Sequence, residues 1–345
     1  MLYVTTRVCK DAFTASRALS ENRCPEGGFF VPMQLPYFER QQIAELAEKT
    51  FCQNMADVLN LLFGTKLDGW NVEFGIGRYP VKLTPLGGKI TIGELWHNPA
   101  RRFERMVIGV EKAIRQSDQI SKRPSDWLVI ASRIAVLFGI VGLLLESGTL
   151  SENQTMDVSV PSGDLSALMA VWYARSMGLP VGTIVCCTNE NSGMWSLLHK
   201  GELRTDMVAR RTHTPDCDYT VPTDLERLIF AALGRRETER FCEVCRTGGT
   251  YDLEAEKQNL LRDGIYVSVV SGKRMASAIP NLYKSKGVVA DPYTALAYCG
   301  LIDYRAAAGE SRPSLIMSEE SPRFWIPFLA DCMDISPAEM KEILD

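Results

Sequence analysis

The middle of the chain alternates between strand-like and helix-like patterns. Residues 155–161 alternate apolar and polar side chains, residues 165–177 place apolar side chains at helical spacing, and residues 181–187 form a β-branched run. A Ser-Gly turn and a Gly-Leu-Pro segment join the three pieces, as in a βαβ unit. Units of this kind build parallel sheets that are buried on both faces. The pattern therefore predicts an α/β fold.

The same patterns extend along the rest of the chain. Residues 79–96 alternate extended pieces around the turn Pro85-Leu86-Gly87-Gly88, and we expect a boundary near residue 80. This divides the chain into an N-terminal subdomain (1–80) and an α/β core (81–345). Helices are predicted at 11–19, 38–50, 55–63, 102–116, 127–146, 224–233, 253–263, 293–308 and 336–344, and extended segments at 29–32, 287–292 and 315–317.

One predicted helix contains a long apolar run. Residues 134–145 are twelve apolar residues in succession, closed by Arg133 and Glu146. A membrane-spanning helix needs about 20 apolar residues. We therefore expect a buried core helix and no membrane partner.

Charge and cysteine content narrow the class of protein. The 345 residues carry a net charge of −4 with a pI near 5.6, which argues against a nucleic-acid partner. Ten cysteines are scattered through a chain long enough to fold without disulfides. Residues 1–12 contain charged side chains and no apolar signal segment. We expect a cytoplasmic protein with reduced thiols.

Short phrases along the chain resemble threonine synthases. Single phrases are unspecific, but they occur here in the family's order. They are Phe13-Thr14-Ala15 with Pro25-Glu26-Gly27-Gly28-Phe29-Phe30-Val31-Pro32, Glu94-Leu95-Trp96-His97-Asn98-Pro99, Val160-Pro161-Ser162-Gly163-Asp164-Leu165, Met177-Gly178-Leu179-Pro180-Val181-Gly182, Thr188-Asn189-Glu190-Asn191 and Asp291-Pro292-Tyr293-Thr294-Ala295.

The resemblance implies a fold and a cofactor. Threonine synthases share the fold of pyridoxal-phosphate enzymes of the tryptophan-synthase-β type, with a large α/β domain and a smaller mobile one. In that family a lysine forms an imine with the cofactor and a glycine-rich loop holds its phosphate. The resemblance covers this chain from about residue 5 to about residue 325.

The chain departs from the family at the cofactor lysine. The family's "LAFKD" phrase is replaced by Arg101-Arg102-Phe103-Glu104-Arg105, so that Glu104 stands in place of the lysine. A carboxylate cannot form an imine, because that reaction needs an amine. The nearest following lysine, Lys112, lies two turns further on.

The expected phosphate and pyridine contacts also differ. The family's "GNFG" has become Gly163-Asp164-Leu165-Ser166, which places a carboxylate where the phosphate would lie. Two unit charges about 4 Å apart repel by roughly 1 kcal/mol in water and about 4 kcal/mol at an effective dielectric of 20. Asp164 also suits the plain role of capping the helix that follows. Glu319 stands in the phrase that offers the family's hydroxyl to the pyridine nitrogen, and a carboxylate can pair with that nitrogen when it is protonated.

A further departure is a missing interval. The family carries most of its small domain between the cofactor helix and the next shared phrase, whereas here only residues 110–125 fill that space. The resemblance therefore predicts a large-domain sheet with flanking helices, a small N-terminal subdomain and a largely deleted mobile domain. Apolar surface left by the deletion predicts self-association or a protein partner.

Several polar groups of the family's cleft are retained. Arg133 matches an arginine that faces the substrate phosphate in that family, and His97, Asn189 and Asn191 match positions near the cleft. If an anion binds, the expected donors are arginines, because guanidinium pairs bidentately with carboxylate or phosphate. These are Arg101, Arg102, Arg105 and Arg133, with Ser162 and Asp164 beside them. A helix-end salt bridge for Arg133 and a structural role for His97 are the alternatives.

The cysteines offer little chemistry. Cys242 and Cys245 form a CxxC pair without a clear second pair, so a structural zinc site is not predicted, and a redox pair stays open. Ser162 and Cys186 have no obvious histidine to activate them. We expect no metal and no cofactor.

Two functional hypotheses follow. The first is a non-catalytic paralogue that binds a small anionic metabolite or a protein partner. The second is a cofactor-independent lyase or transferase that uses Glu104 as general base, with His97, on a phosphorylated or carboxylated amino-acid-like substrate. A closed pocket around Glu104 favours the second and an open groove favours the first. Pyridoxal-phosphate chemistry through another lysine is a third, more remote hypothesis.

Overall fold

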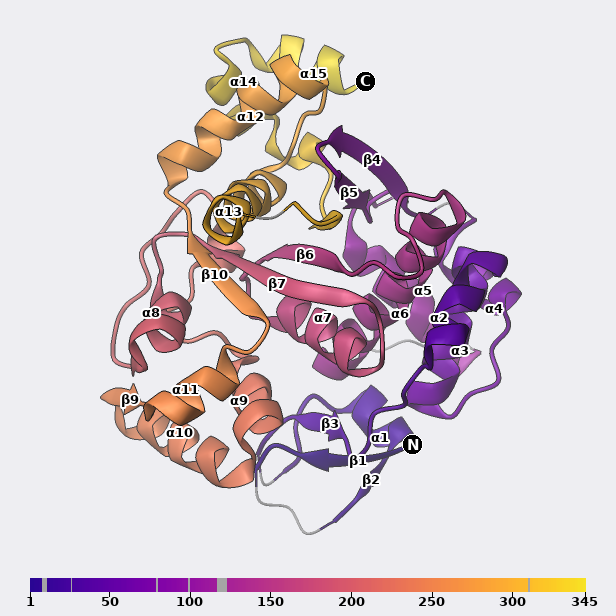
Figure 1. Cartoon of the computed structure of the whole chain (residues 1–345), viewed down its shortest axis with the longest axis vertical. Coiled ribbons are helices and arrows are strands. Elements are labelled where there is room, and N and C mark those ends of the chain that lie inside the picture. The colour runs from indigo at the N-terminus through magenta and orange to yellow at the C-terminus, as the bar shows by residue number, and fades with distance from the viewer. Residues whose placement is uncertain (8–10, 26, 79, 99, 117–122, 310) are drawn as a thin grey trace.

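A six-stranded sheet lies at the centre of the computed structural model (Figure 1), which describes all residues except 8–10, 26, 79, 99, 117–122 and 310. The strand order is β10-β7-β6-β11-β5-β4. Neighbouring strands are parallel except in the β4–β5 hairpin. The predicted α/β fold with a parallel sheet is confirmed. The strands are β4 (Lys82–Gly87), β5 (Ile90–Glu94), β6 (Met156–Pro161), β7 (Val181–Thr188), β10 (Ile265–Val269) and β11 (Ser314–Ser318).

Helices bury both faces of this sheet. On β11, Leu315 belongs to one hydrophobic cluster and the next residue, Ile316, to the other, as expected for a strand covered on both sides. One face packs against α5 (Phe103–Arg115), α6 (Asp126–Glu146) and α7 (Ser166–Ser176). The other packs against α12 (Gly272–Lys286), α13 (Pro292–Ala308), α14 (Ile326–Met333) and α15 (Pro337–Leu344).

Helix α6 is the apolar core helix predicted from the run at 134–145. Among the described residues it is the one helix long and apolar enough to cross a membrane, but most of it is buried inside the protein. Its glycines allow close packing against the N-terminal region. A Cβ at Gly139 would lie 2.6 Å from the Phe51 ring, and one at Gly142 would lie 2.7 Å from the Leu46 carbonyl oxygen.

The N-terminal residues form a small antiparallel sheet and several helices. The sheet has the order β2-β1-β3. Buried residues of this sheet and of the helices beside it belong to the same hydrophobic cluster as those of α6. A boundary near residue 80 stays a prediction, since no gap in the core marks it. The elements are β1 (Leu2–Thr5), β2 (Phe13–Thr14), α1 (Ala15–Ser20), β3 (Phe30–Pro32), α2 (Arg40–Ala44), a 3₁₀ turn (Glu45–Glu48), α3 (Phe51–Phe63) and α4 (Gly69–Ile76).

The remaining elements lie between β7 and β10 or follow β11. Residues 287–290 form no strand, so the extended segment predicted at 287–292 is wrong, and the β4–β5 turn lies slightly later than predicted. The sequence patterns also missed α4, β10 and α12. The other elements are α8 (Gly193–Lys200), β8 (Glu202–Arg204), α9 (Leu225–Leu233), α10 (Arg235–Thr247), β9 (Thr250–Asp252) and α11 (Ala255–Leu261), with 3₁₀ turns at Pro215–Cys217 and Pro322–Trp325.

The connection from α5 to α6 is short. Helix α5 ends at Arg115 and α6 begins at Asp126, and residues 117–122 lie outside the described part. In the described residues the sheets have six, three and two strands, and no further parallel sheet is present. The expected deletion of a second α/β layer at this point stays a prediction.

Asp291 joins α13 to the end of β11. Its carboxylate accepts hydrogen bonds from the Tyr293 and Thr294 backbone N–H groups at 2.9 and 3.2 Å and from the Ser318 hydroxyl at 3.4 Å. Burial raises the pKa of Asp291 to about 6, although the Thr294 hydrogen bonds oppose the rise. The folded protein therefore holds this proton more tightly than the unfolded chain does.

This shift predicts the sign of a pH effect. The contribution of Asp291 to the free energy of unfolding is fully present below its ordinary pKa of 3.8 and is lost as the pH rises through about 6. We expect wild-type stability to fall across that interval relative to Asp291→Asn, which cannot titrate. Urea unfolding of both proteins at each pH measures the difference. A difference that does not change with pH would contradict the prediction.

Candidate functional site

The carboxyl ends of the parallel strands bring the predicted site residues to one edge of the sheet. Ligands of open α/β sheets bind at this edge. His97 follows β5, Ser162 and Asp164 follow β6, Asn189 and Asn191 follow β7, and Glu319 follows β11. The edge is therefore the candidate site, and its side chains determine which ligand it can hold.

Arg133 is the central cation of this edge. Its Nε and Nη2 donate to the two carboxylate oxygens of Glu319 at 2.6 and 2.7 Å, and its Nη1 donates to the Ser166 hydroxyl at 3.1 Å. Ser166 in turn donates to the Asp164 carboxylate. We call this chain of four residues, Glu319–Arg133–Ser166–Asp164, the Arg133 network. The expected helix-end salt bridge is present, and it uses the bidentate face of the guanidinium.

Burial and charge act in opposite directions on Arg133. Its side chain is 11% exposed and that of Glu319 is 28% exposed. Desolvation lowers the pKa of Arg133, but the Glu319 carboxylate outweighs that loss and raises the pKa above its ordinary value. The arginine is therefore a permanently charged group whose charge is already compensated from within the chain.

The start of α7 uses its backbone donors internally. Ser166 N–H donates to the Asp164 carboxylate at 2.9 Å, but Leu165 stands at the N-cap position of α7 and no side chain caps the helix there, so the expected N-cap role of Asp164 is wrong. Gly163 N–H lies 3.4 Å from Cys217 Sγ, and Leu165 N–H donates to the Ser162 carbonyl at 2.8 Å. A phosphate at this turn would need those same N–H groups and would face the Asp164 carboxylate.

The start of α5 lies open to solvent. Glu104, Arg101 and Arg105 are exposed, and neither a hydrogen bond nor an ion pair holds the Glu104 carboxylate in the described structure. Arg102 is paired with Glu320 at 3.0 Å and stacks on the Phe324 ring. Glu104 therefore stands on an open helix end and not in a closed pocket.

His97 is paired with a carboxylate that sequence reasoning did not single out. Its Nε2 lies 2.6 Å from Glu94 Oε2, and its ring stacks on Trp96 with 4.3 Å between centroids. Glu94 also accepts from the Thr84 hydroxyl at 2.8 Å. The signal was present in the phrase Glu94-Leu95-Trp96-His97, because residues three apart were both polar among apolar neighbours.

Asn189 and Asn191 hold a loop in place. Asn189 Nδ2 donates to Asp218 at 2.8 Å, and Asn191 pairs with both backbone groups of Arg210, accepting at 2.8 Å and donating at 2.9 Å. Both side chains are buried. Their donors and acceptors are thus committed to the segment 210–218, which leaves them little capacity for a ligand.

Cys217 accepts the Gly163 N–H at this edge, whereas Cys186, Cys242 and Cys245 show no sign of reactivity. Burial raises the pKa of Cys242 to about 12 and of Cys245 to about 11, and Cys186 is fully buried with a strongly raised pKa, so these thiols are protonated and poor nucleophiles. Within the described ranges, no group of three potential metal-ligating side chains gathers, and no disulfide forms.

Sequence reasoning identified Arg133 and Glu319 separately but not as a pair. They are 186 residues apart, and no local pattern connects them. Only the topology, which brings α6 beside the end of β11, reveals that the two charges neutralise each other.

Known proteins resemble this chain in sequence. Residues 2–72 match the family described as the threonine synthase N terminus. Threonine synthase of Pseudomonas aeruginosa is 26% identical over 192 residues, 55% of this chain and 38% of that protein. Threonine synthase-like 1 of Pongo abelii is 30% identical over 159 residues, 45% of this chain and 21% of that protein. The matches thus span less than half the length of these relatives.

Solved structures share the fold. Pyridoxal-phosphate-bound threonine synthase from Brucella melitensis superposes with a TM-score of 0.85 over 100% of this chain and 94% of that one, at 16% identity. Yeast threonine synthase gives 0.82 over 99% and 93%, also at 16% identity. Residues 2–72 are therefore similar to the N-terminal region of threonine synthases, and the chain as a whole has the fold of these solved structures.

Proposed function

We propose that this chain is a threonine synthase-like protein that neither binds pyridoxal phosphate nor carries out the threonine synthase reaction, and that acts by binding a partner protein or a small anionic metabolite. The Arg133 network is the observation that supports this proposal. A protein that still bound an anionic substrate at this edge would be expected to leave the bidentate face of its buried arginine free.

The residues at the edge do not fit the cofactor. Glu104 replaces the amine that an imine requires, Asp164 places a negative charge beside the turn that would hold the phosphate, and Gly163 N–H is turned toward Cys217. Each change alone weakens binding by a moderate amount. Together they remove the covalent bond, the phosphate cradle and a free cation.

A cofactor-independent enzyme with Glu104 as base has less support. A general base gains strength and selectivity from a water-excluded pocket that also positions the substrate. Glu104 is exposed in the first turn of α5, beside Arg101 and Arg105, which are exposed as well. The open surroundings favour a binding role over a catalytic one.

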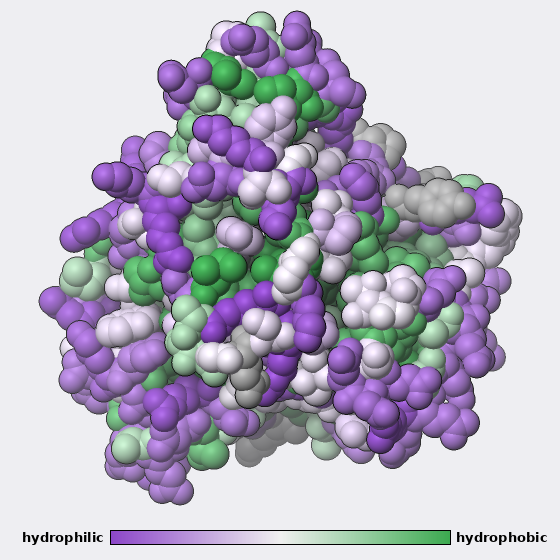
Figure 2. Space-filling view, turned by 45° about the horizontal axis from the view of Figure 1, so that its top comes forward, coloured by the Kyte–Doolittle hydropathy of each residue, from purple (hydrophilic) through white to green (hydrophobic). Residues whose placement is uncertain are grey.

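A protein partner is favoured by apolar surface beside the shortened α5–α6 connection. Helix α4 packs on α5 and presents Trp70 and Phe74, which are 75% and 96% exposed and one turn apart. Figure 2 shows further apolar surface between polar regions on one face. We propose that this region contacts a second copy of the chain.

The cofactor proposal predicts a negative spectroscopic result. Purified protein mixed with pyridoxal phosphate should develop no visible imine band, and borohydride should leave no stoichiometric adduct on any lysine, because no amine stands at position 104. Absorbance and peptide mass mapping measure this. Sparse labelling spread over exposed lysines is the nonspecific background. One fully labelled lysine, at Lys112 or elsewhere, would overturn the proposal.

The Arg133 network predicts a large effect of removing one carboxylate. Glu319→Ala should lower the free energy of unfolding by about 2–3 kcal/mol, somewhat less than for a fully buried pair, since it leaves Arg133 without a counter-charge. Added phosphate should then stabilise the variant more than the wild type. Glu243→Ala, which breaks the exposed pair with Arg246, is the matched control and should leave the urea midpoint unchanged. Equal stability of wild type and Glu319→Ala would argue against an essential network.

The proposed contact between copies predicts an oligomer that depends on α4. Light scattering should give a mass above the 38.5 kDa of one chain, and Trp70→Glu with Phe74→Glu should return it to one chain, because two charges cannot be buried unpaired at the contact. Val208→Glu, at an exposed apolar position elsewhere, is the control. A monomeric wild type would exclude the second copy as partner.

A further inference from the structure

A depression of about 360 Å³ lies at the amino-terminal edge of the six-stranded sheet, where β5, β6 and β11 begin. This is the edge opposite the Arg133 network. The depression falls between the sheet and the turn that follows α6. Its volume is within the range of small-molecule sites in proteins.

The depression combines an apolar floor with unused polar groups. Leu144, Leu150 and Met156 form the floor and are almost fully buried. Thr91 is 7% exposed, and its hydroxyl makes no hydrogen bond to any described residue. The buried polar atoms that lack a partner do not include this hydroxyl, so it is open to water and available to a ligand. Lys89 stands at the rim, and its ammonium has no ion pair in the described structure.

Lys89 is the charged side chain among the described residues that line the depression, and none of them is a carboxylate. Behind them, Arg305 donates to the Ser314 hydroxyl at 2.9 Å and to the Lys89 carbonyl at 3.4 Å. At the end of α6, the Leu143, Leu144 and Leu145 carbonyls accept backbone hydrogen bonds from the turn that follows, and the last residue of the helix is the acidic Glu146.

The backbone holds Lys89 in a costly conformation. Its φ is +61°, a left-handed value that a residue with a Cβ rarely adopts. Arg305 donates to the Gly88 carbonyl at 2.7 Å, and Ser314 N–H donates to the Lys89 carbonyl at 2.8 Å, so the turn is fixed from both sides. Gly88 has a φ of +58° as well, so both central residues of the β4–β5 hairpin have the positive φ that a two-residue turn requires, and the turn accounts for the conformation of Lys89.

We propose that this depression binds a small carboxylic acid with an apolar body, whose carboxylate pairs with Lys89 and accepts a hydrogen bond from Thr91 while its hydrocarbon part covers Leu144, Leu150 and Met156. The site shares no residue with the Arg133 network. It therefore stands whether or not the opposite edge binds a cofactor.

Calorimetric titration of the full-length protein with hexanoate, 1-hexanol and inorganic phosphate tests the assignment. Hexanoate should bind saturably, and both the uncharged alcohol and the anion without a hydrocarbon body should bind at least tenfold more weakly. Lys89→Gln should weaken hexanoate binding about tenfold or more, as expected for the loss of a charge-assisted hydrogen bond. Thr91→Val, which keeps the shape of the side chain, should weaken it about threefold to tenfold.

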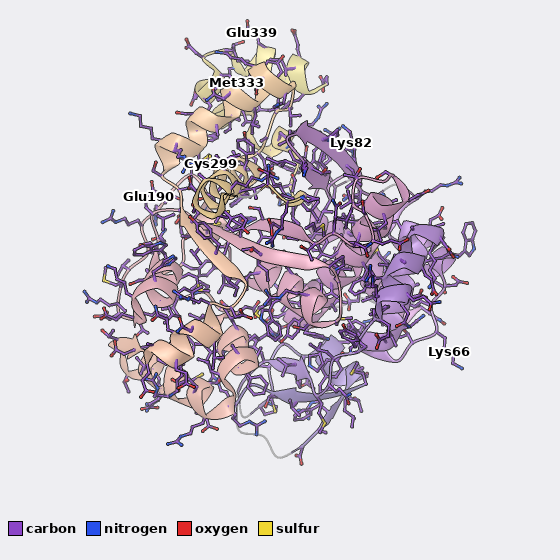
Figure 3. All side chains as sticks on the ribbon, in the orientation of Figure 1. Lys66, Lys82, Glu190, Cys299, Met333 and Glu339 are labelled. Carbon is purple, nitrogen blue, oxygen red and sulfur yellow. The ribbon has the colours of Figure 1, made fainter. Side chains whose placement is uncertain are left out.

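Lys82→Gln provides the matched control. Lys82 lies in the same hairpin, on β4, but near Glu94 at the other edge of the sheet, with 3.8 Å between Nζ and Oε2 (Figure 3). This variant should bind hexanoate as the wild type does. Absence of saturable binding, equal binding of phosphate, or unchanged affinity in folded Lys89→Gln and Thr91→Val would each overturn the proposal.

Discussion

The arrangement of the carboxyl edge of the sheet depends on a buried guanidinium in an apolar helix. Arg133 lies on α6, whose remaining residues are almost all apolar, and removing such a charge from water costs several kcal/mol unless it is paired. Glu319 supplies the pairing, and the Ser166 hydroxyl accepts a further hydrogen bond from Nη1. Because the three residues come from α6, the end of β11 and the start of α7, one electrostatic requirement fixes three elements at the carboxyl edge of the sheet.

The need to neutralise Arg133 also accounts for the acidic residues at this edge. An arginine in this position can be neutralised by a bound anion or by a carboxylate of the chain, and both cannot occupy its bidentate face. Because Glu319 is present, an anionic ligand must displace it, and the ligand must also lose its own hydration. Asp164 repeats this logic at α7, where a carboxylate takes the N–H that an external phosphate would need. At both positions, a carboxylate of the chain occupies the donors that a bound anion would need.

Sequence patterns predicted the elements whose burial is regular. The βαβ unit of β6, α7 and β7 was correct because its apolar spacing reflects a sheet covered on both faces. Helix α12 was missed, since Pro280 interrupts it and charged residues dominate its exposed side. The edge strand β10 was missed as well, although it has five residues like β5 and β11. At the site, resemblance located Arg133, Glu319 and Asp164 singly, while their mutual hydrogen bonds depend on contacts between residues far apart in sequence.

The two edges of the sheet now differ in a way that bears on where a ligand can bind. At the carboxyl edge, Arg133, Asn189, Asn191 and His97 all have partners within the chain, so a ligand there must break existing hydrogen bonds. At the amino edge, the Thr91 hydroxyl and the Lys89 ammonium have no side-chain partner within the part of the chain that the structure describes, so a ligand there has to displace water. The observed affinity reflects the favourable interaction free energy that is left after such costs are subtracted. A ligand therefore has to break fewer existing hydrogen bonds at the amino edge of the sheet than at the carboxyl edge.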